Sequence, residues 1–356
     1  MRFSSLTFLS LIAAGAIANP LDLRPRATLS SFAGTNAYWL PFLTSDADVA
    51  ATFSAVQAAG LKVLRTWGFQ DSTTCTGVHF QCWASSPSSS TPSINTGSDG
   101  LQRLDAVVAA AEKYGVKLVI PFVNNWGDYG GMDVYVSKLG LGSHSEFYTS
   151  TKAQEVYMDY VKTLVERYKS SDAILAWQLA NEPRCNGCST SIITTWAASM
   201  SAYIKSLDPN KLVSLGDEGF FNRSSSTSYP YQGGEGIDFE ENLKITTLDY
   251  GIAHMYPSNW GQTYEWGNQW ISDHAEACRK AGKSCVIEEY GVPVKGATRD
   301  HVVPVALVRR AIDVGVDMFW QFGLTLSTGK SSDDGFTIYT DDSDFQTLVV
   351  DWANSR

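Results

Sequence analysis

The sequence predicts a single-domain (β/α)8 barrel of the α/β class, and three observations lead to this prediction. First, helical patterns, glycines and short apolar runs alternate along the chain, which is typical of βα units on a parallel sheet. Second, eight such apolar runs can be counted, which favours a closed barrel over an open doubly wound sheet. Third, no Gly-x-Gly-x-x-Gly follows any of these runs, which argues against a dinucleotide-binding fold.

The N-terminal residues predict a secretory signal peptide. Residues 1–18 combine Arg2, an apolar run and Ala16-Ile17-Ala18, which matches a cleavage site. The apolar run is too short to cross about 30 Å of hydrocarbon, so a membrane helix is not indicated. Residues 19–26, rich in Pro and Arg, are interpreted as a pro-segment, and 27–356 as the barrel domain of a secreted, extracellular protein.

The expected strands are short apolar runs bounded by polar residues. The clearest lies in 174–180, which begins as a short apolar run of the kind that is buried on both faces. No low-complexity linker interrupts the series, so one domain is expected. In chain order the runs are 32–36, 61–67, 116–123, 174–180, 211–215, 248–254, 284–289 and 316–320.

The expected helices are segments with apolar residues on one face, and several of them end at a glycine. Gly60, Gly115, Gly282 and Gly315 stand where a left-handed residue closes a helix at low cost. Each is followed within two residues by an apolar run, which is the order that βα units require. In chain order the helices are 46–59, 101–114, 151–169, 193–207, 277–281, 304–314 and a closing helix near 345–353.

Composition restricts the partners of this protein. With 37 acidic and 27 basic residues the formal net charge is −10, which argues against binding to nucleic acid or to an anionic membrane surface. The 11 Trp, 16 Tyr and 16 Phe exceed what the core needs and suggest flat platforms for sugar rings, although most single aromatic residues belong to the core. A monomer is expected.

The cysteines predict local disulfides, because a secreted chain oxidises close pairs, although six cysteines allow fifteen connectivities. Cys185-Asn-Gly-Cys188 follows a strand end and opens no helix of a thioredoxin-like unit, so it is interpreted as a brace and not as a redox motif. The five histidines lack zinc-ligand spacing, so neither a metal nor a cofactor is expected. Asn222-Arg-Ser224 is a candidate glycosylation site. The close pairs are Cys75 with Cys82, Cys185 with Cys188, and Cys278 with Cys285.

Two glutamates at predicted strand ends point to the chemistry. Glu182 stands in Asn181-Glu182-Pro183, and because proline cannot extend a ladder, the strand ends there. Glu289 stands at the end of a later run, and on a barrel both glutamates project onto the face that carries catalytic groups. Cleavage of a glycosidic bond needs such a pair, with the pKa of one carboxyl raised and the other ionised. Two structural carboxylates at loop starts are the alternative.

Seven short motifs cover essentially the whole mature chain in order. They are Leu64–Gly68, Phe122–Gly131, Asn181–Cys185, Gly216–Phe220, His254–Pro257, Glu288–Gly291 and Phe319–Gln321. Together they resemble the family 5 glycoside hydrolases, a group of retaining (β/α)8 enzymes, and most closely the fungal secreted endo-β-1,4-mannanases.

This resemblance implies that Glu182 is the acid/base and Glu289 the nucleophile. Glu289 is preferred over Glu288 because the nucleophile of the family directly precedes an aromatic residue and glycine, and strand alternation lets only one of the two face the cleft squarely. The resemblance also implies substrate-binding or supporting roles for other residues. These are Arg65 and Tyr256 beside the nucleophile, Asn181 at the 2-hydroxyl, His254 in the hydrogen-bond network, Trp320 under the sugar, Arg184 and Glu218 on the product side, and Trp67 and Trp126 as further aromatic contacts.

The implied activity is retaining endo-hydrolysis of β-1,4-mannosidic linkages in mannan, galactomannan and glucomannan, with β-mannan as the partner. Mannan differs from cellulose in its axial 2-hydroxyl, and sequence does not place the groups that bind it, so an endo-β-1,4-glucanase of the same family is the alternative. A non-catalytic carbohydrate-binding barrel would need one carboxylate to be missing or misplaced, and both are present in the sequence. A transglycosylase would use the same two glutamates with a different acceptor.

Overall fold

The computed structural model describes residues 29–83, 91–293 and 316–356. The expected signal peptide, the pro-segment and the helix at 304–314 lie outside these residues. The eight expected barrel strands are all present and run parallel, in the order β8-β7-β6-β2-β1-β11-β10-β9 around the sheet. They are β1 (Phe32–Asn36), β2 (Val63–Arg65), β6 (Lys117–Pro121), β7 (Ile174–Gln178), β8 (Leu212–Ser214), β9 (Tyr250–Met255), β10 (Ser284–Tyr290) and β11 (Val316–Phe319).

The sheet closes almost completely into a TIM barrel. The first strand, β1, pairs with β2 on one side and with β11 on the other, where Phe32 lies opposite Val316. The two end strands, β8 and β9, meet through Asp249, whose N–H donates to the Val213 carbonyl (2.8 Å) and whose carboxylate accepts from the Val213 N–H (2.7 Å).

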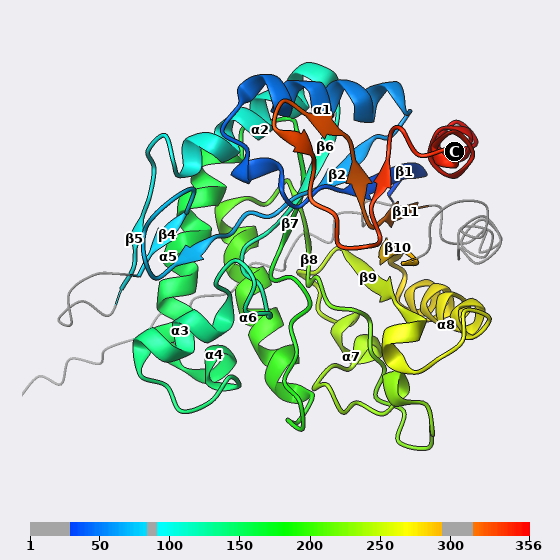
Figure 1. The fold of residues 1–356 in the computed structure, drawn as a ribbon. Helices are drawn as coiled ribbons and strands as arrows, with labels where there is room; N and C mark the ends of the chain where they lie inside the picture. The colour runs from blue at the N-terminus through cyan, green and yellow to red at the C-terminus, as the bar shows by residue number, and fades with distance from the viewer. Residues whose placement is uncertain (1–28, 84–90, 294–315) are drawn as a thin grey trace, which may run out of the picture.

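Helices surround the strands on the outside of the barrel (Figure 1). The predicted glycine ends are confirmed where the structure describes them: Gly60, Gly115 and Gly282 follow helices with φ of 82°, 66° and 66°. The closing helix differs from a regular α-helix, because it is π-helical over Gln346–Asp351. The α-helices are α1 (Asp46–Ala58), α2 (Leu101–Tyr114), α3 (Met132–Leu139), α4 (Glu146–Thr149), α5 (Thr151–Tyr168), α6 (Ser191–Leu207), α7 (Phe239–Asn242) and α8 (Trp266–Ala281), and short 3-10 turns lie at Leu40–Phe42, Tyr229–Tyr231 and Pro257–Trp260.

Strand alternation separates the interior of the barrel from its outer layer. In β2, Val63 belongs to the apolar cluster inside the barrel, whereas Leu64 packs outward with the cluster under the helices. Arg65 follows two residues after Val63, so its side chain returns to the inside at the carboxyl end of the strand. The same alternation in β9 puts His254 above Ile252. A polar layer therefore covers the apolar interior at the end where the strands stop.

Small sheets that the sequence did not predict lie at the carboxyl end of the barrel strands. One joins β3 (Asp71–Ser72), β4 (Gln81–Cys82) and β5 (Ser93–Ile94), and two strand pairs lie after β11. The predicted local cysteine pairs are confirmed as three disulfides, namely Cys75–Cys82, Cys185–Cys188 and Cys278–Cys285. In the part of the chain that the structure describes, no helix has both the length and the apolar character needed to cross a membrane.

Candidate active site

A cleft of about 860 Å³ opens at the carboxyl ends of the barrel strands. It brings together residues that are far apart in the sequence, as the two glutamate strand ends predicted. The predicted residues that line it are Trp67, Trp126, Asn181, Glu182, Arg184, Glu218, Tyr256, Glu289 and Trp320. Two predicted residues, Arg65 and His254, are fully buried beneath it.

The buried guanidinium of Arg65 organises the polar layer. Its Nη1 contacts Glu289 Oε1 at 2.5 Å, its Nη2 donates to Asn181 Oδ1 at 2.6 Å, and its Nε donates to Gln178 Oε1 at 2.8 Å. The same Nε lies 3.2 Å from Glu288 Oε2. Because guanidinium presents its donors in a fixed planar fork, one side chain orients groups from three other strands or strand ends.

Glu182 is held between a histidine and an indole. Its Oε1 lies 2.7 Å from Nδ1 of His254, and its Oε2 accepts a hydrogen bond of 2.6 Å from Nε1 of Trp126. The backbone of Glu182 adopts a positive φ of 50°, and its N–H donates to the carbonyl of Gly216 at 2.8 Å. This left-handed turn directly before proline breaks the line of β7 and turns the carboxylate into the cleft.

Glu289 and Glu288 are separated by an irregularity in β10. The pairing register with β9 shifts between Ile287 and Glu289, which is a β-bulge. Glu289 lines the cleft and accepts a 3.0 Å hydrogen bond from the hydroxyl of Tyr256. Glu288 is completely buried and accepts from Nε2 of Gln178 at 2.8 and 3.1 Å. The bulge therefore gives the two adjacent carboxylates separate positions around one arginine.

Three carboxylates, those of Glu182, Glu288 and Glu289, and two cations determine the electrostatics of the cleft. Burial lowers the pKa of His254, but the charge of Glu289 and the hydrogen bonds to Glu182 and Glu288 raise it to about 10. Burial raises the pKa of Glu182, but the hydrogen bond and charge of His254 outweigh this and leave it below its ordinary value. The proton nearest to Glu182 therefore resides on His254 Nδ1, 2.7 Å from Oε1.

The pKa of Glu289 lies above its ordinary value. Burial raises it, the charges of His254 and Arg65 lower it, and repulsion from Glu182 and Glu288 raises it again. The ion pair with Arg65 and the Tyr256 hydroxyl act against this shift, because both stabilise the ionised carboxylate.

An arginine and a glutamate form the wall of the cleft beyond Glu182. Arg184 binds Glu218 through two hydrogen bonds, of 2.6 Å from Nε and 2.7 Å from Nη2. Its guanidinium also lies over the ring of Trp126, 4.9 Å from the centroid. Burial and repulsion from Glu182 raise the pKa of Glu218 to about 8 despite this partner.

Aromatic rings form the opposite wall. Trp320 stacks on Tyr38, with centroids 5.5 Å apart and planes 8° apart, and Trp67 lies 5.7 Å from Trp320. Nε1 of Trp320 donates to Asp334 Oδ2 at 2.5 Å, which fixes the indole. Sequence reasoning missed Tyr38 and Asp334. The position of Tyr38, two residues after β1, was an available signal, because residues that follow barrel strands line this face.

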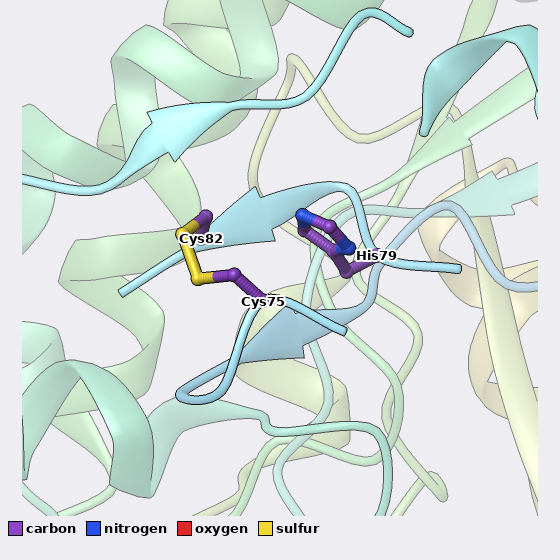
Figure 2. Close-up of side chains that lie close together, drawn as sticks. All are labelled: Cys75, His79 and Cys82. Atoms are coloured by element: carbon purple, nitrogen blue, oxygen red, sulfur yellow. A yellow bond between two sulfur atoms is a disulfide. The ribbon is translucent and has the colours of Figure 1, made fainter. Parts of the chain in front are cut away.

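Among the residues that the structure describes, two side-chain groups have the composition of a metal site. In the first, the sulfurs of Cys75 and Cys82 are bonded to each other beside His79 (Figure 2), so neither is a thiolate that could bind zinc. The imidazole of His79 bonds instead to the carbonyl of Gly77 at 2.8 Å. The second group is Glu182, His254 and Glu289, in which a protonated imidazole offers no lone pair to a cation.

Known proteins resemble this chain over most of its length. A family model described as "GH family 5 beta-mannosidase-like" matches residues 83–304. A mannan endo-1,4-beta-mannosidase F from Aspergillus fumigatus is 53% identical over 328 residues, which cover 90% of this chain and 73% of that protein. A mannan endo-1,4-beta-mannosidase A from Aspergillus aculeatus is 50% identical over 325 residues, covering 90% of this chain and 85% of that protein. The crystal structure of an endo-1,4-beta-mannanase from Rhizomucor miehei superposes with a TM-score of 0.85 at 38% identity, covering 93% of this chain and 97% of that one.

Proposed function

This chain belongs to glycoside hydrolase family 5, in its beta-mannosidase-like group, and we propose that it hydrolyses β-1,4 linkages within mannan chains through Glu182 and Glu289. The printed names of its relatives, which are mannan endo-1,4-beta-mannosidases at 50 to 53% identity, support mannan as the substrate. The substrate class includes galactomannan and glucomannan.

One observation carries the mechanism: a carboxylate oxygen of Glu182, a carboxylate oxygen of Glu289 and a nitrogen of His254 all lie within 4.8 Å of one another. Retaining glycosidases place their two carboxyl groups about 5–5.5 Å apart, whereas inverting enzymes separate them by roughly 6.5–9.5 Å to admit a water molecule. The short separation supports direct attack by one carboxylate and therefore retention of the anomeric configuration.

In the first step, ionised Glu289 attacks the anomeric carbon while the carboxyl of Glu182 donates its proton to the leaving glycosidic oxygen. A bond forms between carbon and Oε of Glu289 as the bond to the leaving sugar breaks. Arg65 and Tyr256 orient the attacking carboxylate through the 2.5 and 3.0 Å contacts. His254, 2.7 Å from Glu182, supplies the proton that Glu182 carries at the moment of transfer.

In the second step, Glu182 acts as the base. It removes a proton from a water molecule that enters the place of the departed sugar, and the water oxygen displaces Glu289 from the anomeric carbon. The proton that Glu182 has gained then returns to His254, 2.7 Å away, and the starting state is restored. Asn181 carries the contact to the 2-hydroxyl, since its amide is fixed by Arg65 at 2.6 Å and by Asn124 at 2.9 Å. The stacked pair of Trp320 and Tyr38 supports the sugar ring at the point of cleavage.

Secretion and glycosylation belong to the same proposal. Asn222 is exposed, so its side chain is open to a glycosyltransferase, and its Nδ2 donates to Asp238 at 3.2 Å. Three disulfides in the described residues fit an oxidising compartment.

The test measures reducing ends released from galactomannan, carboxymethylcellulose and xylan by the wild type, Glu289→Ala and the control Glu155→Ala, a change at an exposed residue of α5. We expect activity on galactomannan that is lost in Glu289→Ala and kept in Glu155→Ala. Preferred activity on the cellulose derivative would replace mannanase by glucanase. Normal turnover by Glu289→Ala would overturn the mechanism.

Azide rescue separates the roles of the two glutamates. With an activated aryl β-mannooligoside, azide restores turnover in Glu289→Ala by attacking the face that the nucleophile normally uses, and gives an α-glycosyl azide. In Glu182→Ala it attacks the covalent intermediate and gives the β-glycosyl azide. Exchanged products would mean that the two roles are exchanged.

A further inference from the structure

A second hollow, of about 530 Å³, lies next to the catalytic cleft. The two hollows share only Trp126 and Arg184, which form a ridge between them. The floor and far rim of the second hollow come from the loop between α3 and α4, from the Cys185–Cys188 loop and from Glu235. None of the residues on that far rim has a part in the mechanism above.

The ridge stands on the leaving-group side of the cleft. Trp126 bonds to Glu182, the residue that must reach the leaving oxygen, and Arg184 follows Glu182 by two positions. The nucleophile side is formed by different residues. One of them is Trp320, whose backbone N–H donates to the carbonyl of Tyr290, the residue after Glu289, at 2.9 Å. A polysaccharide chain that leaves the cleft past Glu182 therefore meets the ridge first and the second hollow next.

The ridge exposes aromatic surface. Among the described residues, the large hydrophobic side chains that are exposed are Trp126, at 40%, and Tyr229, at 37%, and both lie at this end of the cleft. Exposed aromatic surface beside polar groups is typical of a ligand-binding surface, because it offers a large rigid contact at little conformational cost. A pyranose ring presents the flat C–H face that fits such a surface.

The lining of the second hollow is polar, and its two acidic side chains are paired. His144 Nδ1 lies 2.7 Å from Asp133 Oδ1, and Arg184 Nη1 lies 3.4 Å from Glu235 Oε2. Each acidic side chain of the lining therefore has a partner within the lining. Exposed hydroxyl and amide groups, including those of Ser143, complete the rim. The chemistry fits a neutral ligand with many hydroxyl groups.

The hollow is also held rigidly. Asn125 Oδ1 accepts the backbone N–H of Arg184 at 3.1 Å and lies 3.0 Å from His144 Nε2, so one amide joins three loops. The disulfide between Cys185 and Cys188 braces the loop that follows. A preformed site of this kind binds without the cost of ordering mobile loops.

We propose that the second hollow is an additional subsite that binds a hexopyranose of the leaving-group chain, beyond the units held at Arg184 and Glu218. This inference rests on the proposed function. Two kinds of hexopyranose could occupy the subsite, because both present hydroxyl groups and a flat C–H face. One is the next β-1,4-linked backbone unit, and the other is a galactosyl branch on the chain. The subsite makes cleavage depend on the length or the branching of the substrate on one side of the cut.

The test fills the hollow with a large side chain and measures kcat/KM and the position of cleavage in defined oligosaccharides. Ser143→Trp places an indole on the rim, where Ser143 is exposed and bonds only to Ser145 and Glu146. Asn186→Trp fills the hollow from the opposite rim, and it serves as a second variant if the first does not fold. Ser272→Trp is the matched control, because Ser272 is exposed on α8, a helix that contributes no residue to either hollow. Folding of each variant is checked by thermal unfolding.

Substrates are mannotetraose, mannohexaose and a galactosylated mannooligosaccharide, cleaved in ¹⁸O-water so that mass spectrometry locates each cut. If the hollow binds a backbone unit, the filled variants should cleave mannohexaose less efficiently while mannotetraose is little affected. We expect the ratio of the two kcat/KM values, mannohexaose over mannotetraose, to fall about five-fold, which is the effect of losing one hydrogen bond or ring contact. The cuts should then move toward shorter leaving chains. A galactosyl branch would instead lower only kcat/KM for the galactosylated substrate.

Unchanged ratios and unchanged cut positions in a folded filled variant would overturn the subsite, as would equal losses in Ser272→Trp. Failure of the proposed function gives a different result, because the wild type would then cleave none of the three oligosaccharides.

Discussion

At the scale of single residues, the site depends on Arg65. This guanidinium is fully buried and contacts Glu288, Glu289, Gln178 and Asn181. Removing one member of a buried charge cluster leaves the others without compensation, which costs more than an exposed ion pair ever contributes. Stability and catalysis are therefore coupled at this position.

We expect Arg65→Lys to lower the free energy of unfolding by about 3–5 kcal/mol and kcat/KM by more than about 100-fold. Lysine keeps the charge but cannot reach all four partners with one ammonium group. Urea unfolding and initial rates on galactomannan check this. Arg167→Lys, at a partly exposed ion pair with Asp105, is the control and should change stability by less than about 1 kcal/mol. Equal effects of the two substitutions would contradict the central role of Arg65.

Trp126 acts on Glu182 through its indole N–H, which donates to Oε2 at 2.6 Å. This hydrogen bond lowers the pKa of Glu182, so Trp126→Phe should raise that pKa and move the alkaline limb of the kcat/KM profile to higher pH. The maximal kcat/KM should fall by about 10-fold or more, since a hydrogen bond to a charged group is lost. Tyr229→Phe, at the neighbouring exposed aromatic residue, should leave the limb in place. A limb that stays fixed in Trp126→Phe would show that the indole does not act on Glu182.

At the scale of elements, the position of Glu182 depends on the contact between the ends of β7 and β8. Gly216, just after β8, has a φ of 86°, and its carbonyl accepts the Glu182 N–H. A Cβ at Gly216 would lie 1.9 Å from the carbonyl oxygen of Ala180. Only glycine allows the two backbones to approach this closely.

We expect Gly216→Ala to cost more than about 3 kcal/mol of unfolding free energy and to lower activity further by displacing Glu182. Gly115→Ala is the matched control, because Gly115 has a similar positive φ of 66° but its Cβ would meet nothing within 4 Å. It should cost only about 1–2 kcal/mol, the strain of the left-handed conformation. Urea unfolding measures both. Similar costs would mean that backbone strain, and not the contact with Ala180, dominates at Gly216.

The sequence predicted elements better than it predicted irregularities. The eight barrel strands and the glycine helix ends followed from local patterns, because each depends on neighbouring residues. The bulge in β10 and the π-helical turn at Gln346–Asp351 did not, since both arise from packing against distant segments. Likewise, Gln178 and Glu288 were given no role, because their partnership spans 110 residues and leaves no mark on local spacing.

At the scale of the whole molecule, several buried groups keep protons that the unfolded chain would release. Burial raises the pKa of Asp71 to about 7 and that of Glu218 to about 8, and the surrounding carboxylates raise that of His254 to about 10. Between the ordinary and the raised value the native state binds more protons, so stability falls as pH rises through each window. His274 opposes this only between about 4 and 6.5, because burial lowers its pKa to about 4.

The thermal midpoint should therefore fall as pH rises from 7 to 10. In this range His254 and Glu218 lose their protons and the native state is destabilised, whereas the opposing effect of His274 is confined to lower pH. Each proton contributes at most about 1.4 kcal/mol per pH unit. Calorimetry between pH 5 and 10 measures the slope. In Glu218→Gln the slope between pH 7 and 8 should be smaller, and the slope from 8 to 10 should remain. A midpoint that is constant or rises from pH 7 to 10 would contradict these protonation states.

The pairing of β1 with β11 has a consequence for biosynthesis. Phe32 lies opposite Val316, and Nδ2 of Asn36 donates to the carbonyls of Glu288 (2.9 Å) and Phe319 (3.2 Å). A nascent chain on the ribosome has no catalytic centre until its eighth strand has emerged and docked beside its first, and such distant contacts form slowly. Hydrolytic activity therefore appears only after the whole barrel has folded. A cell that makes this enzyme therefore holds no active glycosidase in the form of an incomplete barrel.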